Sequence, residues 1–528
     1  MDEEKITIEG VVENIIFSNE ENGYTVCEII SENELFTIVG TMPFLVAGET
    51  VKAQGTWSLH PSFGRQFKVE CFEKALPADQ EAIYKYLSSG SIKGIGPVTA
   101  QRIVDRFGED TFDVLEKNPE WLSEIRGITK KNAEKIAESF ASQFGVRSVM
   151  LFLNKFFGAS ISVKIYKKYK SAAIDIVKSN PYRLCSEISG IGFEKADRVA
   201  KELGFSNDCD ERLESGIKYV LMNSAYQNGH SYLPYSIFIS ESQKVLSADI
   251  SAIDNMISFC VQKGEIVRHE YDGHEGYSLL RLFGAESYIA QKLKQLNSND
   301  LPFRLDGIDT QIDILEKSQD IIYHEKQRKA IKFASCYGIS VVTGGPGTGK
   351  TTVIKAILNI YDTLGISYML AAPTGRAAKR MNESSGREAK TIHRLLEMVY
   401  SDDGIPVFSR NADNPLGCKA IIIDEMSMVD IFLMEALLRA IKPDSILVLI
   451  GDADQLPSVG PGNILSDMIA CDIFPVTRLE HIFRQASESL IIMNAHRINN
   501  GEQPVLTIKN SDFFFMERQN PLDARDLI

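Results

Sequence analysis

The chain has 528 residues, which at roughly 150 residues per domain predicts three or four domains and not one compact module. Hydrophobic residues make up 44% of it and charged residues 24%, a composition that disfavours disordered, collagen-like and coiled-coil classes. The formal net charge of −14 argues against nucleic acid coating the whole surface, so any contact with DNA has to be local.

The cysteines and the apolar runs indicate the compartment. Eight cysteines are scattered along the chain without a CxxC pair, a usage that fits reduced thiols in a cytosol. No apolar run approaches the ~18 residues of a membrane span, and the first ten residues lack the basic and apolar regions of a signal peptide. We therefore expect a cytoplasmic protein without membrane contact.

Residues 1–76 are predicted to form an OB-like β-barrel. Five short strand-forming runs lie between residues 5 and 73, separated by turn signals such as Glu21-Asn22-Gly23. Barrels of five strands bind single-stranded DNA in some proteins and are structural covers in others. Both roles stay open for this segment.

Residues 77–206 are predicted to be helical and contain an internal repeat. Three glycines, Gly94, Gly127 and Gly190, each precede an isoleucine and then an apolar stripe at helical spacing. Seven residues after that isoleucine each copy carries a cation that points away from the stripe: Arg102, Lys135 and Arg198. The repeat resembles the helix-hairpin-helix family, which implies DNA-phosphate binding by the turns and these cations. Turns that merely join packed helices are the alternative.

Two further segments complete the part of the chain before the motor motifs. Residues 207–295 are predicted to be winged-helix-like, with helices followed by two strands joined near Asp272-Gly273. Because winged helices contact proteins as often as DNA, we assign this segment no specific role. Residues 296–322 are predicted to be a connector.

The strongest motif is a phosphate-binding loop at residues 344–351, placed between an apolar strand and a helix. Its glycine N–H groups are expected to wrap phosphates, while Lys350 reaches the β and γ oxygens and Thr351 supplies a hydroxyl to Mg²⁺. The residues predicted to bind ATP here are Gly344, Gly345, Pro346, Gly347, Thr348, Gly349, Lys350, Thr351 and Thr352.

Two more strands bring polar side chains to the same edge of a sheet. The strand at 420–423 ends in Asp424 and Glu425. Asp424 is expected to orient Mg²⁺, and Glu425 is the candidate general base for the attacking water. The strand at 446–450 leads to Gln455, which is placed to touch the γ-phosphate on one side and DNA on the other.

The motifs of residues 323–498 together resemble the RecD-like group of superfamily 1B helicases. They are VVTGGPGTGKTT, AAPTGRAAKRM, TIHRLL, IIIDEMSMVD, GDADQLPSVGPGN and LEHIFRQA. The barrel, hairpins and winged region are similar to the N-terminal extension of the long stand-alone members. The resemblance therefore implies a multidomain α/β chain with a RecA-like P-loop motor domain, preceded by the OB-like β-barrel, the helix-hairpin-helix region and the winged-helix-like region.

The resemblance also assigns roles to residues of the motor, which it places at 323–480. Gln327 matches the glutamine that reads adenine, and Arg484 matches an arginine that reaches the γ-phosphate from the second motor lobe. The residues implied to contact single-stranded DNA are Thr374, Arg376, Thr391 and His393. The local charge agrees, because residues 371–394 hold six Lys or Arg against two Glu. A hairpin predicted at 397–417 matches the pin that splits the duplex, with an ordinary surface hairpin as the alternative.

RecD-like chains continue into a complete second motor domain, of which residues 481–528 are only the start. We therefore expect a C-terminally truncated chain that binds MgATP but hydrolyses it slowly.

The sequence as a whole predicts an ATP-dependent DNA helicase in DNA repair or recombination, acting on single strands and duplex junctions. Its 5′ to 3′ direction rests on the resemblance alone. One alternative is a DNA-binding scaffold whose motor fragment binds ATP but hydrolyses it poorly. A small-molecule phosphotransferase is disfavoured by Glu425, Gln455 and the three hairpins.

Overall fold

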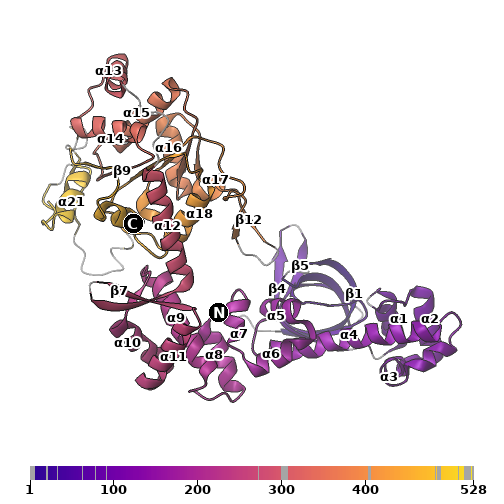
Figure 1. Ribbon diagram of the computed structural model, residues 1–528. Coiled ribbons are helices and arrows are strands. Elements are labelled where there is room, and N and C mark those ends of the chain that lie inside the picture. Colours follow the sequence, from indigo (N-terminus) through magenta and orange to yellow (C-terminus); the bar gives the residue numbers. More distant parts are fainter. Residues whose placement is uncertain are drawn as a thin grey trace. The chain divides into compact units, whose positions relative to one another are not determined.

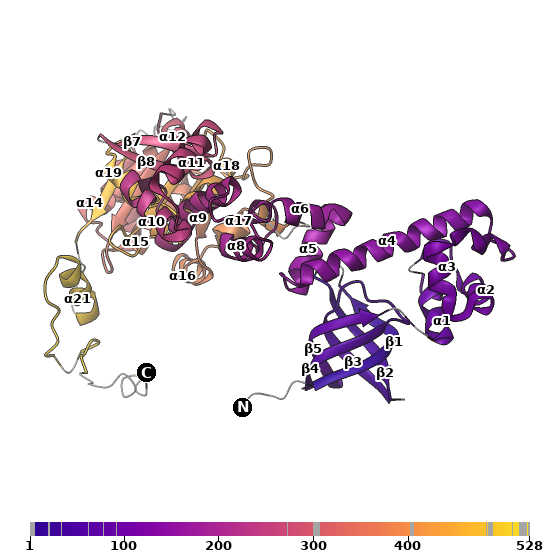
Figure 2. The same ribbon diagram turned by 90° about the horizontal axis from the view of Figure 1, so that it is seen from below.

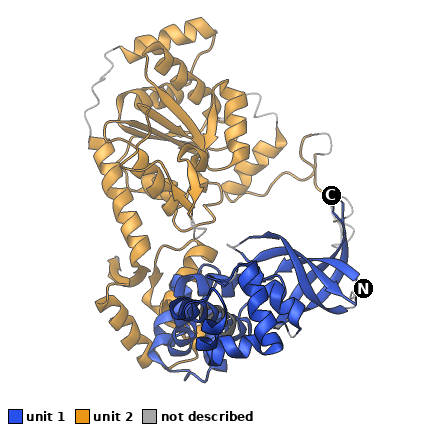
Figure 3. Ribbon diagram, turned by 90° about the vertical axis from the view of Figure 1, so that its right-hand side faces the viewer, with its two compact units in different colours: residues 1–215 blue, residues 216–528 orange. Residues whose placement is uncertain are grey.

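The computed structural model describes residues 6–19, 22–32, 34–61, 63–75, 77, 79–90, 92–271, 273–298, 307–401, 406–481, 483, 489–508, 511–516 and 525. It divides into two compact units, which Figure 3 colours separately. Unit 1, residues 1–215, holds a barrel and a series of helical hairpins. Unit 2, residues 216–528, holds the winged-helix-like region and the motor.

The first five strands of unit 1 form a closed barrel, as predicted (Figure 2). In barrel order β1-β2-β3-β5-β4, they are β1 Ile6–Ser18, β2 Tyr24–Ser31, β3 Glu34–Thr41, β5 Gly64–Ala75 and β4 Thr50–His60. Alternating apolar side chains such as Val12, Ile38 and Phe67 fill the interior. At a bulge in β4, the backbones of β4 and β5 lie very close together. A Cβ on Gly55 would lie 2.0 Å from the Lys68 carbonyl oxygen, so only glycine fits there.

Helical hairpins occupy the rest of unit 1. The helices are α1 Gln80–Ser88, α2 Pro97–Phe107, η1 Gly108–Asp110, α3 Thr111–Lys117, η2 Pro119–Glu124, α4 Lys130–Asn154, α5 Ala159–Tyr169, η3 Lys170–Ala172, α6 Ala173–Ser179, α7 Arg183–Glu187 and α8 Phe193–Glu202. The three glycines of the repeat share one conformation, with φ of 99° at Gly94, 103° at Gly127 and 96° at Gly190. Positive φ favours glycine, which explains why this residue opens each copy.

A buried ion pair fastens α8 to the start of α9, Asp210–Asn228. The Arg212 guanidinium donates to both carboxylate oxygens of Asp197, from Nε at 2.6 Å and from Nη2 at 3.4 Å. The Tyr182 hydroxyl donates to the same carboxylate at 2.8 Å. Arg212 is 4% exposed and Asp197 7%, so each charge depends on the other for compensation.

The winged-helix-like region joins the motor through one long helix. Its elements after α9 are β6 Leu233–Pro234, α10 Tyr235–Leu246, α11 Ile250–Gln262, β7 Ile266–Tyr271, β8 His274–Leu279 and α12 Leu280–Ser298. Strands β6, β8 and β7 form an antiparallel sheet. One face of α12, with Leu282 and Leu293, enters the same core as Leu437 of the motor. An ion pair of 2.6 Å between Arg281 and Glu435 adds to this attachment.

The motor is a parallel sheet covered by helices (Figure 1). Its elements are α13 Ile308–Gln319, α14 Glu325–Cys336, β9 Ile339–Gly344, α15 Lys350–Thr363, β10 Tyr368–Ala372, α16 Gly375–Ser385, β11 Ala389–Thr391, α17 Ile392–Leu395, β12 Met398–Tyr400, β13 Pro406–Phe408, β14 Ala420–Ile423, η4 Met426–Met428, α18 Ile431–Ala440, β15 Ile446–Gly451, α19 Ile464–Ala470, β16 Val476–Leu479 and α21 Leu490–Asn499. The strand order is β11-β10-β14-β15-β9-β16, and the paired strands run parallel. Strands β14 and β15 are buried along their whole length, as expected between two layers of helices.

Three details differ from the sequence-based expectations or lie beyond them. The predicted connector, residues 296–322, includes helix α13, whose Ile308 and Ile312 belong to the motor core. The tip of the predicted hairpin at Asp402-Asp403-Gly404 lies outside the described residues, although its flanking strands β12 and β13 pair as expected. Within the described residues, no helix is both long and apolar enough to cross a membrane.

Candidate active site and DNA-binding elements

The loop from Gly344 to Thr351 links β9 to α15 and wraps around its own lysine. The Lys350 ammonium donates to the carbonyl oxygen of Gly344 and, at 3.2 Å, to that of Gly345. The Thr348 hydroxyl closes the loop by donating to the same Gly345 oxygen at 2.8 Å. Lys350 is therefore held inside the loop at the N-terminus of α15, a position suited to meeting phosphate oxygens.

Gln327 lies in the first turn of α14, where it helps to cap the helix and also lies against the phosphate-binding loop. Its side-chain oxygen accepts the N–H of His324 at 3.1 Å, and the His324 ring accepts the N–H of Lys326 at 3.3 Å. The Gln327 amide nitrogen lies so near Gly349 that a Cβ there would be 2.4 Å from it. Position 349 therefore needs a glycine for two reasons: its φ is 84°, and the Gln327 side chain leaves no room for a Cβ.

The acidic pair follows β14, two strands from the loop in the sheet order, with β15 between them. Burial raises the pKa of Asp424, opposed by the Glu425 N–H, by Lys350 and by Arg380. Burial and then the charge of Asp424 raise the pKa of Glu425. Glu425 has a left-handed φ of 54°, and strained residues of this kind gather at functional sites.

Gln455 lies beyond β15 together with a carboxylate that the sequence analysis did not single out. Asp452, at 3% exposed, accepts from the Gln455 side chain at 3.5 Å and from the Asp454 N–H at 3.1 Å. Its charge also raises the pKa of Glu425. Arg380 was missed as well; it comes one helical turn after Arg376, and this spacing was the available signal.

A ring stack beside Gln327 was also missed. The rings of His324 and His481 stack with centroids 4.9 Å apart, and Phe483 meets His481 edge-on at 4.9 Å. The Phe483 N–H donates to the Gly347 oxygen at 3.4 Å, so this segment contacts the phosphate-binding loop. Arg484, the next residue, lies outside the described part of the chain.

The residues implied to contact single-stranded DNA lie at the starts of two helices. The Thr374 hydroxyl caps α16 by accepting the Ala377 N–H at 3.2 Å, and the Thr391 hydroxyl caps α17 by accepting the Arg394 N–H at 3.2 Å. Arg376 is exposed, and the His393 ring lies 6.1 Å from that of Phe408 in the hairpin. Each threonine thus has a structural role beside any contact with DNA.

The three cations of the hairpin repeat are exposed but not equivalent. The Arg102 guanidinium donates to the Arg126 carbonyl oxygen at 2.7 Å. For Lys135 and Arg198, the described residues offer no hydrogen-bond or ion-pair partner.

The donor set fits Mg²⁺ held jointly with a nucleotide. Asp424 is a half-buried carboxylate and Thr351 an exposed hydroxyl next to the loop lysine, and Mg²⁺ is commonly bound by one or two protein oxygens plus substrate phosphates. Among the described residues, no group of three or more His, Cys, Asp or Glu side chains could hold a metal ion.

Comparison with protein families divides the chain in the same way. Residues 5–77 match the OB-fold domain of the ATP-dependent DNA helicase YrrC, and residues 87–142 match a SAM-like helix-hairpin-helix tandem. Residues 142–232 match the helix-hairpin-helix domain of ATP-dependent RecD2 DNA helicases, and residues 327–461 match an AAA domain.

A curated relative decides the family. The ATP-dependent RecD2 DNA helicase of Deinococcus radiodurans is 30% identical over 520 residues, covering 95% of this chain and 71% of the relative. The chain belongs to the family of ATP-dependent RecD2 DNA helicases. The predicted RecD-like resemblance, the fold class and the assignment to ATP-hydrolysing DNA helicases are thereby confirmed.

Shorter matches surround this RecD2 assignment. The RecBCD enzyme subunit RecD of Mycolicibacterium smegmatis is 38% identical over 168 residues, covering 28% of this chain and 30% of that protein. The Pif1 helicase of Candida albicans is 24% identical with a TM-score of 0.26, covering 36% of this chain and 50% of that chain. The chain thus spans about half the length of that solved helicase.

A cavity of about 1030 Å³ lies in unit 2 between the winged-helix-like region and the segment after Gln455. Its lining includes Glu286 of α12 and Asp467 of α19. Burial raises the pKa of Glu286, with a further rise from the Asp467 charge, and burial raises the pKa of Asp467. Ionisation of either carboxyl therefore lowers the stability of the folded chain.

Glu286→Gln is expected to stabilise the chain at neutral and alkaline pH. A folded-state pKa above the unfolded value gives stability that is present at acidic pH and lost as pH rises through the folded value. The neutral amide avoids this loss, so the melting temperature at pH 7 to 8 should rise by about 2–4 °C. Thermal melts between pH 4 and 8 measure it, and a parent-like pH profile in the variant would contradict the assignment.

Proposed function

We propose that this chain uses ATP hydrolysis to move 5′ to 3′ along single-stranded DNA and to unwind duplex DNA, in repair or recombination. The observation that carries the proposal is the meeting of the phosphate-binding loop with Asp424, Glu425 and Asp452 at the carboxyl ends of β9, β14 and β15. In an open parallel sheet this edge is where ligands bind.

The nucleotide chemistry follows from the character of each group. Lys350 neutralises phosphate charge, and Glu425 accepts the proton of the water that attacks the γ-phosphate. Asp424 and Thr351 hold Mg²⁺, which screens the phosphate charge when it is bound. Gln327 reads the base, Gln455 senses the γ-phosphate, and Arg484 supplies positive charge to that phosphate.

The DNA contacts are proposed for a strand running across the starts of α16 and α17. Thr374, Arg376, Thr391 and His393 face this strand, and the β12–β13 hairpin parts the duplex ahead of it. The motor motifs carry local positive charge in an otherwise acidic chain, which suits phosphate binding. All eight cysteines are free thiols, which supports the proposed cytoplasmic location.

Duplexes with a 5′ or a 3′ single-stranded tail test the proposal. The chain should show ATPase activity that single-stranded DNA stimulates many-fold, and it should unwind the 5′-tailed duplex and not the 3′-tailed one. DNA binding without turnover would favour the scaffold alternative. Preference for the 3′ tail would refute the direction.

His393→Ala is expected to weaken binding of a single-stranded oligonucleotide about tenfold, while ATP affinity without DNA stays unchanged. The ring lies at the start of α17, away from the phosphate-binding loop, so its loss removes a base or backbone contact. Fluorescence titration with labelled oligonucleotide measures it. Unchanged affinity in His393→Ala would leave this motif a purely structural helix start.

A further inference from the structure

The structure contains a fourth helical hairpin that the glycine pattern does not show. Helix α5 begins after Gly158, which precedes it as Gly96 precedes α2. Ser162 and Ile165 are fully buried at the positions that Ala100 and Ile103 occupy in α2. Phe156 stands where the other copies have their first glycine, so the glycine pattern does not extend to this hairpin.

The four hairpins form two tandem pairs built in the same order. Helix α2 ends at Gly108 with φ 55° and ψ −130°, and α5 ends at Lys170 with φ 53° and ψ −129°. A 3-10 turn and a seven-residue helix follow in both cases. The matching backbone, including a lysine held at positive φ, makes the pairs structural copies of one another.

In both pairs, a cationic side chain on the helix of the first hairpin donates a hydrogen bond to a backbone carbonyl in the turn of the second hairpin. Arg102 Nη1 donates to the Arg126 oxygen at 2.7 Å, one residue before Gly127. Lys164 Nζ donates to the Ser189 oxygen at 3.4 Å, one residue before Gly190. Each cation thus occupies the same helix position and holds the same atom of the turn.

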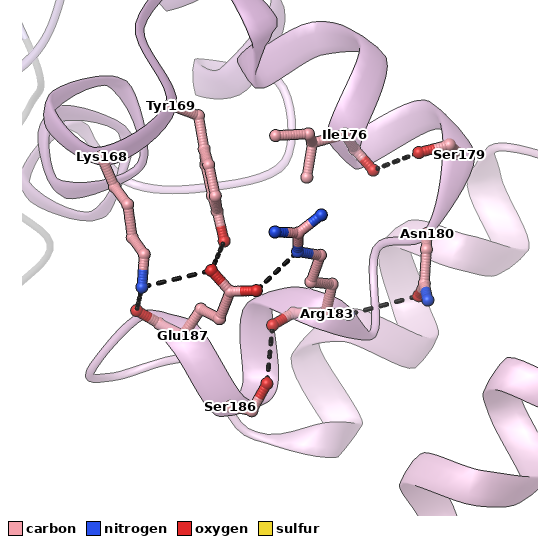
Figure 4. A network of polar contacts seen from close by, with 8 residues as sticks. All are labelled: Lys168, Tyr169, Ile176, Ser179, Asn180, Arg183, Ser186 and Glu187. Atoms are coloured by element: carbon pink, nitrogen blue, oxygen red, sulfur yellow. Dashed lines mark hydrogen bonds and ion pairs between the residues drawn. The ribbon is translucent and has the colours of Figure 1, made fainter.

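A second contact, one helical turn further on, is also duplicated. Arg106 Nη2 lies 3.2 Å from Glu124 Oε2, and Lys168 Nζ lies 3.2 Å from Glu187 Oε2. Figure 4 shows the second case, in which the Tyr169 hydroxyl and Arg183 Nε also donate to Glu187, at 2.9 and 2.5 Å. The Arg183 hydrogen bond is the main reason that the pKa of Glu187 falls to about 2. These cations are engaged with the protein.

One cation on the helix of each second hairpin is left for a ligand. Lys135 follows the Gly127 turn on α4, and Arg198 follows the Gly190 turn on α8. Both side chains are exposed, and neither has a hydrogen-bond or ion-pair partner within the described ranges. An exposed cation on the helix that begins directly after a glycine turn is an arrangement that a phosphate can recognise.

We propose that Arg102 and Arg106, with Lys164 and Lys168, are positioning residues that fix the second turn of each pair, so that the DNA backbone is contacted at Gly127 with Lys135 and at Gly190 with Arg198. The proposal rests on the DNA-phosphate binding that the helix-hairpin-helix resemblance implies for these turns. It divides the three repeat cations into one positioning residue, Arg102, and two phosphate contacts.

The salt dependence of DNA binding separates the two roles. The double variant Lys135→Ala with Arg198→Ala, made in the full chain, should bind a labelled blunt duplex more weakly. The slope of log affinity against log salt concentration should become shallower by about 2, since each phosphate contact contributes about 0.9 to it. Arg102→Ala with Lys164→Ala should weaken binding about tenfold and leave the slope unchanged. Arg102→Lys, with Lys164 unchanged, should bind DNA as the parent chain does, because a lysine makes the equivalent hydrogen bond in the second pair.

Each contrary result has its own meaning. If the Arg102 and Lys164 variant loses slope as the other variant does, or keeps its affinity, the positioning role is refuted while hairpin binding stands. If the Lys135 and Arg198 variant keeps both affinity and slope, the hairpins do not bind the DNA backbone, which refutes the binding role on which this proposal rests and leaves the proposed motor function untouched. Melting curves of every variant verify folding, and the Arg102→Lys chain provides the folded reference.

Discussion

Glu425→Gln is expected to lower ATP turnover by about 10²- to 10⁴-fold while ATP still binds with nearly its original affinity. The carboxylate lies at the end of β14 beside Asp424, where burial and the neighbouring negative charge raise its pKa and make it the stronger base. The amide has the same shape but cannot take a proton from water. Only the chemical step should therefore suffer.

Lys350→Ala provides the contrast. Its ammonium is held by the carbonyl oxygens of Gly344 and Gly345 inside the loop, so its removal takes away the positive charge that meets the phosphates. Binding of ATP should be lost. Affinity from titration with a fluorescent nucleotide, together with steady-state turnover at saturating single-stranded DNA, separates the two variants. Equal loss of binding in both would refute the division of roles.

Arg212→Ala is expected to destabilise unit 1 by about 3–5 kcal/mol, since it leaves the buried carboxylate of Asp197 without its main partner. Tyr182 and Lys201 also contact this carboxylate, at 2.8 Å each, but Lys201 reaches it from solvent and cannot replace the guanidinium. Denaturation with urea, followed by circular dichroism, gives the change in unfolding free energy.

The matched control is the double substitution Arg212→Ala with Asp197→Ala. Because no buried charge remains, it should cost less than Arg212→Ala alone, even though more atoms are removed. If the double variant is as unstable as the sum of the single variants, the two side chains act independently. The ion pair would then not be what fastens α8 to α9.

How far the sequence predicts this molecule depends on whether the signal is local. The loop at 344–351 and Asp424 with Glu425 are recognisable because their neighbours in space are also neighbours in sequence, or end adjacent strands. Three hairpins are recognisable because a positive φ demands glycine. The fourth is not, since its turn is built around Phe156 without that backbone requirement.

Residues brought in by tertiary structure had little signal of this kind. Arg380, which acts on the acidic pair from α16, had only its spacing from Arg376, and Phe483 reaches the loop because β16 pairs with β9. The helix α13 was taken for a connector because its short apolar face is complete only against α14 and α15. The roles of the individual site residues remain predictions, and the variants above test them.

The edge strand β16 gives the motor a mechanical property. It runs parallel to β9, with Leu479 paired to Gly344, so the chain leaves the sheet beside the first residue of the phosphate-binding loop. Tension applied along the strand axis to the segment after Leu479 would load the hydrogen bonds between β16 and β9 in shear. In this geometry the hydrogen bonds break together and not one by one. Force from whatever lies beyond residue 483 would therefore be delivered to the nucleotide-binding loop itself, through a strand that is hard to peel away.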